Sequence, residues 1–266
     1  FAKARCLNQP TSESDSMADF IEGKRPVIEA LRTRVPLKYI LMADNLSQGD
    51  SIVRDIQRKA KNLDVPIKKV SKKKLDEISE RGSHQGVMAE ALPFDYVNGT
   101  AILKAAEASA EAHDGRALVV VLDHITDAGN LGAISRSAEA VGACGLIIPN
   151  KRSAHVEAST YKSSAGAISH IPVSQVANLV SCLERLKDEG FWVCAATEHA
   201  SDLIWDANLK GKIVLVMGNE GDGVSRLVLE NCDFGVKLPQ VGAVSSLNVA
   251  QASTACMYEW LRQNWE

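Results

Sequence analysis

The sequence predicts an α/β protein whose larger part is a mostly parallel sheet covered by helices on both sides. Apolar runs recur through the second half of the chain, at 117–124, 144–149, 191–196, 212–218 and 234–239. They lack polar alternation, which indicates strands buried on both faces, as in a parallel sheet. Helical stretches fill the gaps, at roughly 130–142, 159–167, 175–189, 225–231 and 247–263. Regular strand–helix alternation is typical of this fold class.

Residues 19–95 alternate over a shorter length and predict a small α/β domain. Pro26 suits the first position of a helix, so a short helix is expected at 26–33. Strand, helix, strand, helix and strand follow in that order, at 38–43, 51–63, 66–70, 72–80 and 86–92. The stretch 51–63 is predicted as a helix because its apolar residues recur at helical spacing.

A change of composition separates the two parts of the chain. Residues 96–114 are rich in alanine, which favours a helix. We therefore expect a linker at 96–114, or a helix that crosses between a domain at 19–95 and a domain at 115–266. Residues 1–18 are polar and are expected to be a flexible tail or a cloning remnant, with Met17 as a candidate natural start.

Composition excludes several classes of protein. No apolar run approaches the roughly 20 residues that span a bilayer, so no membrane association is expected. The first residues also lack the apolar centre of a signal peptide. The six cysteines form no C-x-x-C pair, and four lie in apolar contexts, which predicts reduced cysteines in a cytoplasmic protein. The six histidines show no metal-ligand spacing, so no metal is expected.

Charge is distributed unevenly along the chain. The net charge of −3 argues against a general nucleic-acid binder, but residues 54–74 carry nine basic and two acidic side chains. Such a run is either a solvated helix face or a local patch that contacts phosphates. Composition alone leaves both interpretations open.

Two polar loops follow predicted strands, where ligands bind in open parallel sheets. The first, at 123–143, places Asn130 just before a predicted helix and Arg136 inside it. The second, at 216–225, has three glycines around Glu220. Glycines permit close approach of the backbone to a ligand. Each loop also has a purely structural interpretation, as a helix cap with a surface charge and as a tight turn capped by Ser225.

A third polar segment precedes the last predicted helix. Ser245, Ser246 and Asn248 crowd around Leu247 where that helix starts. One such residue is enough to cap the free N–H groups of a first turn. The surplus of hydrogen-bonding groups predicts a ligand site.

The three segments together carry a specific signal. Their order, N-L-G-x-x-x-R, then M-G-N-E-G-x-G, then L-P-x-x-G-x-V-S-S-L-N-V-A, resembles the SpoU/TrmH family of RNA 2′-O-ribose methyltransferases. In the smaller part, EGKRPVIEAL and SHQGVMAE resemble the RNA substrate-binding domain of the ribosomal members. The resemblance covers almost everything from about residue 19 onward. It is greatest to members that methylate a guanosine ribose in 23S ribosomal RNA.

The resemblance implies a parallel α/β sheet with a C-terminal trefoil knot, a homodimer, and S-adenosylmethionine bound in the knotted region. The cofactor-binding positions that it implies are Gly218, Leu238, Leu247, Thr197, Asn219 and Gly221. The polar active-site positions that it implies are Asn130, Arg136, Glu220, Ser246 and Asn248. Gln240 departs from the methionine of many members.

Methyl transfer requires alignment of the ribose hydroxyl with the methyl donor, and the hydroxyl must lose its proton. Arg136 is the helper that the resemblance implies, although a guanidinium with a pKa above about 12 is a poor base. Its expected role is to hold the adjacent phosphate or to stabilise the developing alkoxide. The rival functions are a transfer-RNA or antibiotic-resistance ribose methyltransferase and, in another class, an RNA-binding module without catalysis.

Overall fold

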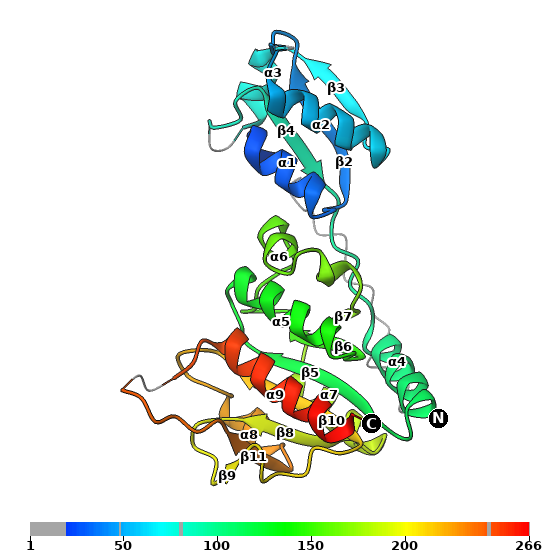
Figure 1. Ribbon diagram of the computed structural model, residues 1–266, viewed down its shortest axis with the longest axis vertical. Helices are drawn as coiled ribbons and strands as arrows, with labels where there is room; N and C mark the ends of the chain where they lie inside the picture. Colours follow the sequence, from blue (N-terminus) through cyan, green and yellow to red (C-terminus); the bar gives the residue numbers. More distant parts are fainter. Residues whose placement is uncertain (1–19, 48, 80–81, 244–245, 266) are drawn as a thin grey trace. The chain divides into compact units, whose positions relative to one another are not determined.

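The computed structural model describes residues 20–47, 49–79, 82–243 and 246–265 of the chain. The described chain divides between Asp95 and Tyr96 into two compact units, each with its own sheet (Figure 1). Each unit has a hydrophobic core of its own.

The smaller unit is a four-stranded sheet in the order β1-β4-β2-β3. Its strands are β1 (Phe20–Glu22), β2 (Leu37–Ala43), β3 (Ile67–Val70) and β4 (Val87–Ala91). Its helices are α1 (Lys24–Arg32), α2 (Ser51–Asn62) and α3 (Lys72–Ile78). β4 pairs antiparallel with β1 and β2, whereas β2 and β3 are parallel. Leu75 of α3 packs with Leu41 and Met88 on one face of the sheet.

The larger unit is a seven-stranded parallel sheet in the order β7-β6-β5-β10-β8-β11-β9. Its strands are β5 (Ala117–Asp123), β6 (Gly145–Pro149), β7 (Val173–Val176), β8 (Trp192–Ala196), β9 (Asp202–Leu203), β10 (Lys212–Gly218) and β11 (Phe234–Lys237). All seven residues of β5 are buried, which confirms that both faces of this strand are covered. The predicted α/β class with a mostly parallel sheet is therefore confirmed.

Helices cover both faces of this sheet. They are α4 (Gly99–Ala112), α5 (Ala128–Ala140), α6 (Ala158–Ser163), the short 3-10 helix η1 (Ala167–Ser169), α7 (Leu179–Asp188), α8 (Arg226–Glu230) and α9 (Val249–Asn264). Buried residues of α4, α7 and α8 share one core with alternate residues of β5 and β10. On the other side, α5 packs against α9, and Ser137 bonds Thr254 between them at 2.7 Å.

The structure differs from the sequence predictions in three places. Residues 173–176 form strand β7, although a helix was predicted from 175, and α7 begins only after Asn178, whose side chain accepts a bond from Ser181 N–H. Residues 99–112 form a helix as predicted, but it is not a free linker, because Ile102 and Ala106 are fully buried against the large sheet. The short edge strands β1 and β9 were not predicted, because two or three residues carry too little pattern.

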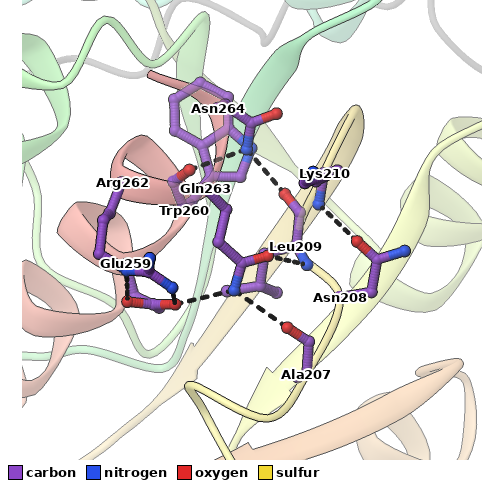
Figure 2. A network of polar contacts seen from close by, with 9 residues as sticks. All are labelled: Ala207, Asn208, Leu209, Lys210, Glu259, Trp260, Arg262, Gln263 and Asn264. Atoms are coloured by element: carbon purple, nitrogen blue, oxygen red, sulfur yellow. Dashed lines mark hydrogen bonds and ion pairs between the residues drawn. The ribbon is translucent and has the colours of Figure 1, made fainter. Parts of the chain in front are cut away.

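The carboxyl end of α9 is fastened to the loop that precedes β10 (Figure 2). Asn264 donates to the carbonyls of Leu209 and Trp260 and accepts from Gly211 N–H at 3.0 Å. Gln263 accepts from Leu209 N–H at 2.8 Å. These side chains satisfy backbone groups that would otherwise be buried without partners.

The cysteines that the structure describes are all free thiols. Burial raises the pKa of Cys182 to about 11 and that of Cys256 to about 12, so both are protonated at neutral pH. Cys6 lies outside the described residues. Within the described part of the chain, no helix is long and apolar enough to cross a membrane.

Candidate active site

The candidate site lies where strands β5 and β10 end. The two strands are hydrogen-bonded neighbours, and their register pairs Asp123 with Gly218. The loop that leads to α5 and the glycine-rich loop at 219–223 therefore start from the same edge of the sheet. This edge is the usual ligand-binding side of a parallel α/β sheet.

Three side chains from three separate segments meet at this edge. Asn248 donates from Nδ2 to Glu220 Oε1 at 2.6 Å and to Asn130 Oδ1 at 3.0 Å. Asn130 in turn donates from Nδ2 to the same Glu220 oxygen at 3.1 Å. We call these three residues the amide–carboxylate triangle. It joins one residue from each of the three polar segments.

Helix starts position two members of the triangle. Asp127 caps α5 by accepting from Asn130 N–H at 2.7 Å. Asn130 therefore lies in the first turn of the helix, and the prediction that it lies just before the helix was wrong. Asn248 is itself the cap of α9, because its Oδ1 accepts from Ala250 N–H at 2.9 Å. The cap uses the oxygen of Asn248 and leaves its NH₂ group for the other two members.

A tight loop positions Glu220. Asn219 and Gly223 exchange backbone hydrogen bonds of 3.1 Å in both directions. The Asn219 side chain also accepts from Gly221 and Asp222 N–H, at 2.8 and 2.7 Å. Gly218 is required just before this loop, because a Cβ there would lie 2.0 Å from the carbonyl carbon of Gly223. The glycines thus serve the fold of the loop that carries the carboxylate.

A cavity of about 560 Å³ opens beside the triangle. Asn130, Glu220, Asn219 and Gly221 line it, together with residues that the sequence analysis did not select: Asp123, His124, Asp127, Arg152 and Asp222. Their positions in the sequence could have indicated three of them, because Asp123 and His124 end one predicted strand and Arg152 follows the next one.

The other residues that the family resemblance implies for the cofactor lie along the same sheet edge and do not line this cavity. Register pairs Met217 with Ala196 and Ala196 with Val236, so the chain emerges at Gly218, Thr197 and Lys237 on three neighbouring strands. Leu238 follows directly and is partly buried. Ser246 and Leu247 are exposed ahead of α9, and Ser245 lies outside the described residues. None of Thr197, Gly218, Leu238, Ser246 and Leu247 is among the residues that line the cavity.

Arg136 is not brought to the triangle within one chain. It lies on α5, is exposed, and does not line the cavity. Within the ranges described, it makes no hydrogen bond or ion pair to another residue. The structure leaves its guanidinium available to a group from outside the chain.

The ionic groups of the cavity suit hydrogen bonding more than metal binding. Among the described residues, no group of three or more histidine, cysteine, aspartate or glutamate side chains could hold a metal ion. Glu220 already accepts from two amide groups and, at 3.4 Å, from Val249 N–H. The arrangement offers a fixed carboxylate, amide groups and one guanidinium at Arg152.

Two sequence families match the two units. The model of the SpoU rRNA methylase family matches residues 117–258, which hold the amide–carboxylate triangle. The RNA 2′-O ribose methyltransferase substrate-binding family matches residues 20–97. Both units of the chain are thus accounted for.

Individual proteins resemble the chain over most of its length. A Bacillus subtilis (strain 168) protein named "Putative TrmH family tRNA/rRNA methyltransferase YacO" is 38% identical over 245 residues, which are 92% of this chain and 96% of that protein. The crystal structure of the SpoU methyltransferase AviRb from Streptomyces viridochromogenes, in complex with AdoMet, matches with a TM-score of 0.62 at 26% identity, over 97% of this chain and 94% of that one.

A shorter structure matches only part of the chain. The A. aeolicus TrmH/SpoU tRNA modifying enzyme is 27% identical with a TM-score of 0.51, and the match covers 61% of this chain and 83% of that chain. The triangle, the sheet and the family matches agree with one another. The chain therefore belongs to the SpoU rRNA methylase family and is an RNA methyltransferase.

Proposed function

We propose that this enzyme transfers a methyl group from S-adenosylmethionine to the 2′-hydroxyl of a ribose in RNA, and that the target is a guanosine in 23S ribosomal RNA. The observation that carries the proposal is the amide–carboxylate triangle of Asn130, Glu220 and Asn248, of which Asn130 and Glu220 line a cavity at the carboxyl edge of the sheet. Such a fixed polar frame orients a hydroxyl with little cost in reorganisation.

The residues at the neighbouring strand ends fit the methyl donor. Gly218, Thr197 and Leu238 follow three adjacent strands and can offer backbone groups to its polar ends. Val241 is fully exposed, and Leu247 is 45% exposed in the same connection to α9, so apolar surface is available to cover an adenine ring. When bound, the donor would supply an electrophilic methyl group.

The chain's own residues would then hold the ribose. Glu220 and Asn248 fix the side chain of Asn130, which lines the cavity and uses one of its two Nδ2 hydrogens on Glu220. The second Nδ2 hydrogen of Asn130 is proposed to bond the ribose. Ser246 lies exposed beside Leu247 and is proposed to contact the ribose or the donor. Arg152, which lines the cavity, offers charge to an RNA phosphate.

Arg136 is proposed to act within a homodimer. Its side chain is exposed on α5 and lies outside its own chain's cavity, as expected for a group that meets RNA next to a subunit interface. Light scattering of the purified protein should give twice the chain mass. A monomer that retains full activity would contradict this part of the proposal.

The ribosomal target is favoured over transfer RNA by the smaller unit. The matched tRNA modifying enzyme covers only 61% of this chain, whereas this chain also carries the substrate-binding unit at residues 20–97. A trefoil knot at the C-terminal segment and a cytoplasmic location complete the proposal. The knot is what the family resemblance implies, and the location is what the scattered cysteines predict.

The basic run is proposed to hold RNA backbone. Lys68, Lys72, Lys73 and Lys74 are exposed, on β3 and α3. Reversing the charge of Lys72, Lys73 and Lys74 should weaken RNA binding and flatten its dependence on salt, because fewer counterions are released. Binding that is unchanged across a salt series would assign these lysines to a solvated face.

Methyl transfer tests the proposed function directly. Purified protein should move the labelled methyl group of S-adenosylmethionine to 23S RNA and not to transfer RNA, and mapping should place it on a guanosine 2′-oxygen. Arg136→Ala should bind the donor normally and transfer almost no methyl. Failure of the wild-type protein to bind the donor would favour an RNA-binding module without catalysis.

A further inference from the structure

An aspartate and a histidine form a dyad at the end of β5. Asp123 is 1% exposed, and its Oδ1 lies 2.5 Å from His124 Nδ1. Its other oxygen accepts from Ser225 N–H at 2.6 Å, so both carboxylate oxygens have fixed partners. Asp123 is thus fixed both by its place at the end of β5 and by Ser225, which follows the glycine-rich loop after β10. Asp123 and His124 both line the cavity beside the triangle.

The free edge of the imidazole is available to the cavity. The His124 side chain is 30% exposed and lines the cavity, while Nδ1 is bound to the buried carboxylate. Nε2 has no partner among the residues that the structure describes. A carboxylate on Nδ1 favours the neutral tautomer that carries its proton there, so Nε2 is left as a proton acceptor.

The backbone at His124 lies in the left-handed region, where few residues other than glycine are found. Its φ is +59°, in the left-handed region that costs most residues free energy. A glycine or asparagine would take this conformation more easily. Strained residues of this kind concentrate at functional sites, where the surrounding structure holds them.

The reaction needs a proton acceptor that the triangle does not supply. Glu220 Oε1 already accepts from Asn130, Asn248 and Val249. A guanidinium such as that of Arg136 is a poor base, because its pKa exceeds about 12. Neither a carboxylate nor a guanidinium ordinarily titrates near neutral pH, as an imidazole does.

We propose that His124 Nε2 accepts the proton of the ribose 2′-hydroxyl and that Asp123 is the positioning residue that holds the ring. This inference rests on the proposed function. A bond forms between the ribose O2′ and the methyl carbon of the donor. The bond between that carbon and the sulfur breaks, and the sulfur keeps its electron pair. The hydroxyl proton passes to Nε2. The positive charge of the sulfonium is thus replaced by that of an imidazolium, which the Asp123 carboxylate stabilises.

Several charged groups line the cavity beside the ring. Asp123 contacts the ring from β5, and Asp127 lines the same cavity from the start of α5. Glu220 and Asp222 line it from the glycine-rich loop, and Arg152 from the loop after β6.

The test compares His124→Asn with a matched control, His170→Asn. Asparagine tolerates the left-handed backbone but cannot take the proton, whereas His170 is exposed and does not line the cavity. His124→Asn should reduce methyl transfer by about 100-fold or more with donor and RNA affinities retained. The wild-type rate should fall at low pH, where Nε2 is protonated, and the variant should lack that limb. His170→Asn should behave as wild type.

A second readout needs neither donor nor RNA. Nitrogen NMR of the protein alone should show His124 protonated at Nδ1 and unprotonated at Nε2 at high pH. Asp123→Asn should lower the rate of methyl transfer and change the His124 tautomer that nitrogen NMR detects, because Nδ1 loses its carboxylate partner. His124→Gly should melt at the same or a higher temperature than wild type and should still be slow, which excludes misfolding as the cause.

The outcomes separate this inference from the proposed function. A wild-type protein that transfers no methyl to any RNA would remove the proposed function itself. An active wild type together with a His124→Asn variant of the same rate and pH profile would overturn only the role of His124. An Nε2-protonated tautomer in the free protein would do the same.

Discussion

The two ends of helix α9 carry similar amide side chains in different settings. At its start, exposed Asn248 bonds to the side chains of Glu220 and Asn130 beside a cavity. At its end, the side-chain amide of buried Asn264 bonds to the carbonyls of Leu209 and Trp260 (Figure 2) and to Gly211 N–H. An amide that satisfies backbone groups fixes the fold, whereas one that joins other side chains at a cavity prepares a site for chemistry. The comparison predicts that the first end controls rate and the second controls stability.

The largest effect is expected at the start of α9. Asn248→Asp keeps an oxygen that can cap the helix but removes the NH₂ group that bonds Glu220 and Asn130. The rate of methyl transfer should fall about 100-fold, because one preorganised donor is lost and two carboxylates meet. Single-turnover kinetics measures the rate of methyl transfer. As a control, urea unfolding at low pH, where the carboxyls are neutral, should show little change in the free energy of unfolding. A variant with the wild-type rate would remove Asn248 from the site.

The next effect is expected at the other end. Asn264→Ala leaves Gly211 N–H and the Leu209 carbonyl without their side-chain partner. The free energy of unfolding should fall by about 2 kcal/mol, since backbone groups lose their hydrogen bonds. Urea unfolding measures it, with the rate per folded molecule as the control. A variant with an unchanged free energy of unfolding and a lower rate of methyl transfer per folded molecule would contradict the proposed difference between the two ends of α9.

The smallest effect is expected at the exposed ion pair of the same end. Arg262 lowers the pKa of Glu259 through two hydrogen bonds of 2.8 Å. The carboxylate therefore stabilises the fold above its unfolded pKa of about 4.3, and the contribution is lost as the pH falls through its lower folded pKa. Glu259→Gln should cost less than about 1 kcal/mol at pH 7, because Arg262 is 66% exposed. Thermal melts at pH 7 and pH 3 should show a smaller gap for the variant than for wild type.

The same comparison shows how far the sequence could predict the molecule. The apolar strands of the large sheet were predictable because burial on both faces leaves continuous runs such as 117–123. Asn130, Glu220 and Asn248 were selected through the resemblance of their three motifs, taken together, to the SpoU/TrmH family, since each loop by itself also has a purely structural interpretation. Their direct bonding was not predictable, because it depends on the register of β5 and β10 and on a loop closed by Asn219 and Gly223.

Other features had no local signal. Strand β7 is only four residues long, so the pattern of α7 extended over it. Helix α4 was predicted as a helix, but its place in the core depends on contacts from Ile102 and Ala106 to a distant sheet. The dyad of Asp123 and His124 was missed because a histidine in the left-handed region has no sequence pattern. Asn264 and Gln263 resembled an ordinary polar helix end.

The most direct test of the central claim is methyl transfer by Glu220→Ala, because Glu220 is the member that both amides share. The measurement is the rate at which a labelled methyl group appears on the ribose 2′-oxygen of 23S RNA, per folded molecule, beside wild type. The account predicts that the wild type labels the RNA and that the variant, equally folded, loses at least about 100-fold of the rate. Equal labelling by both proteins would contradict it.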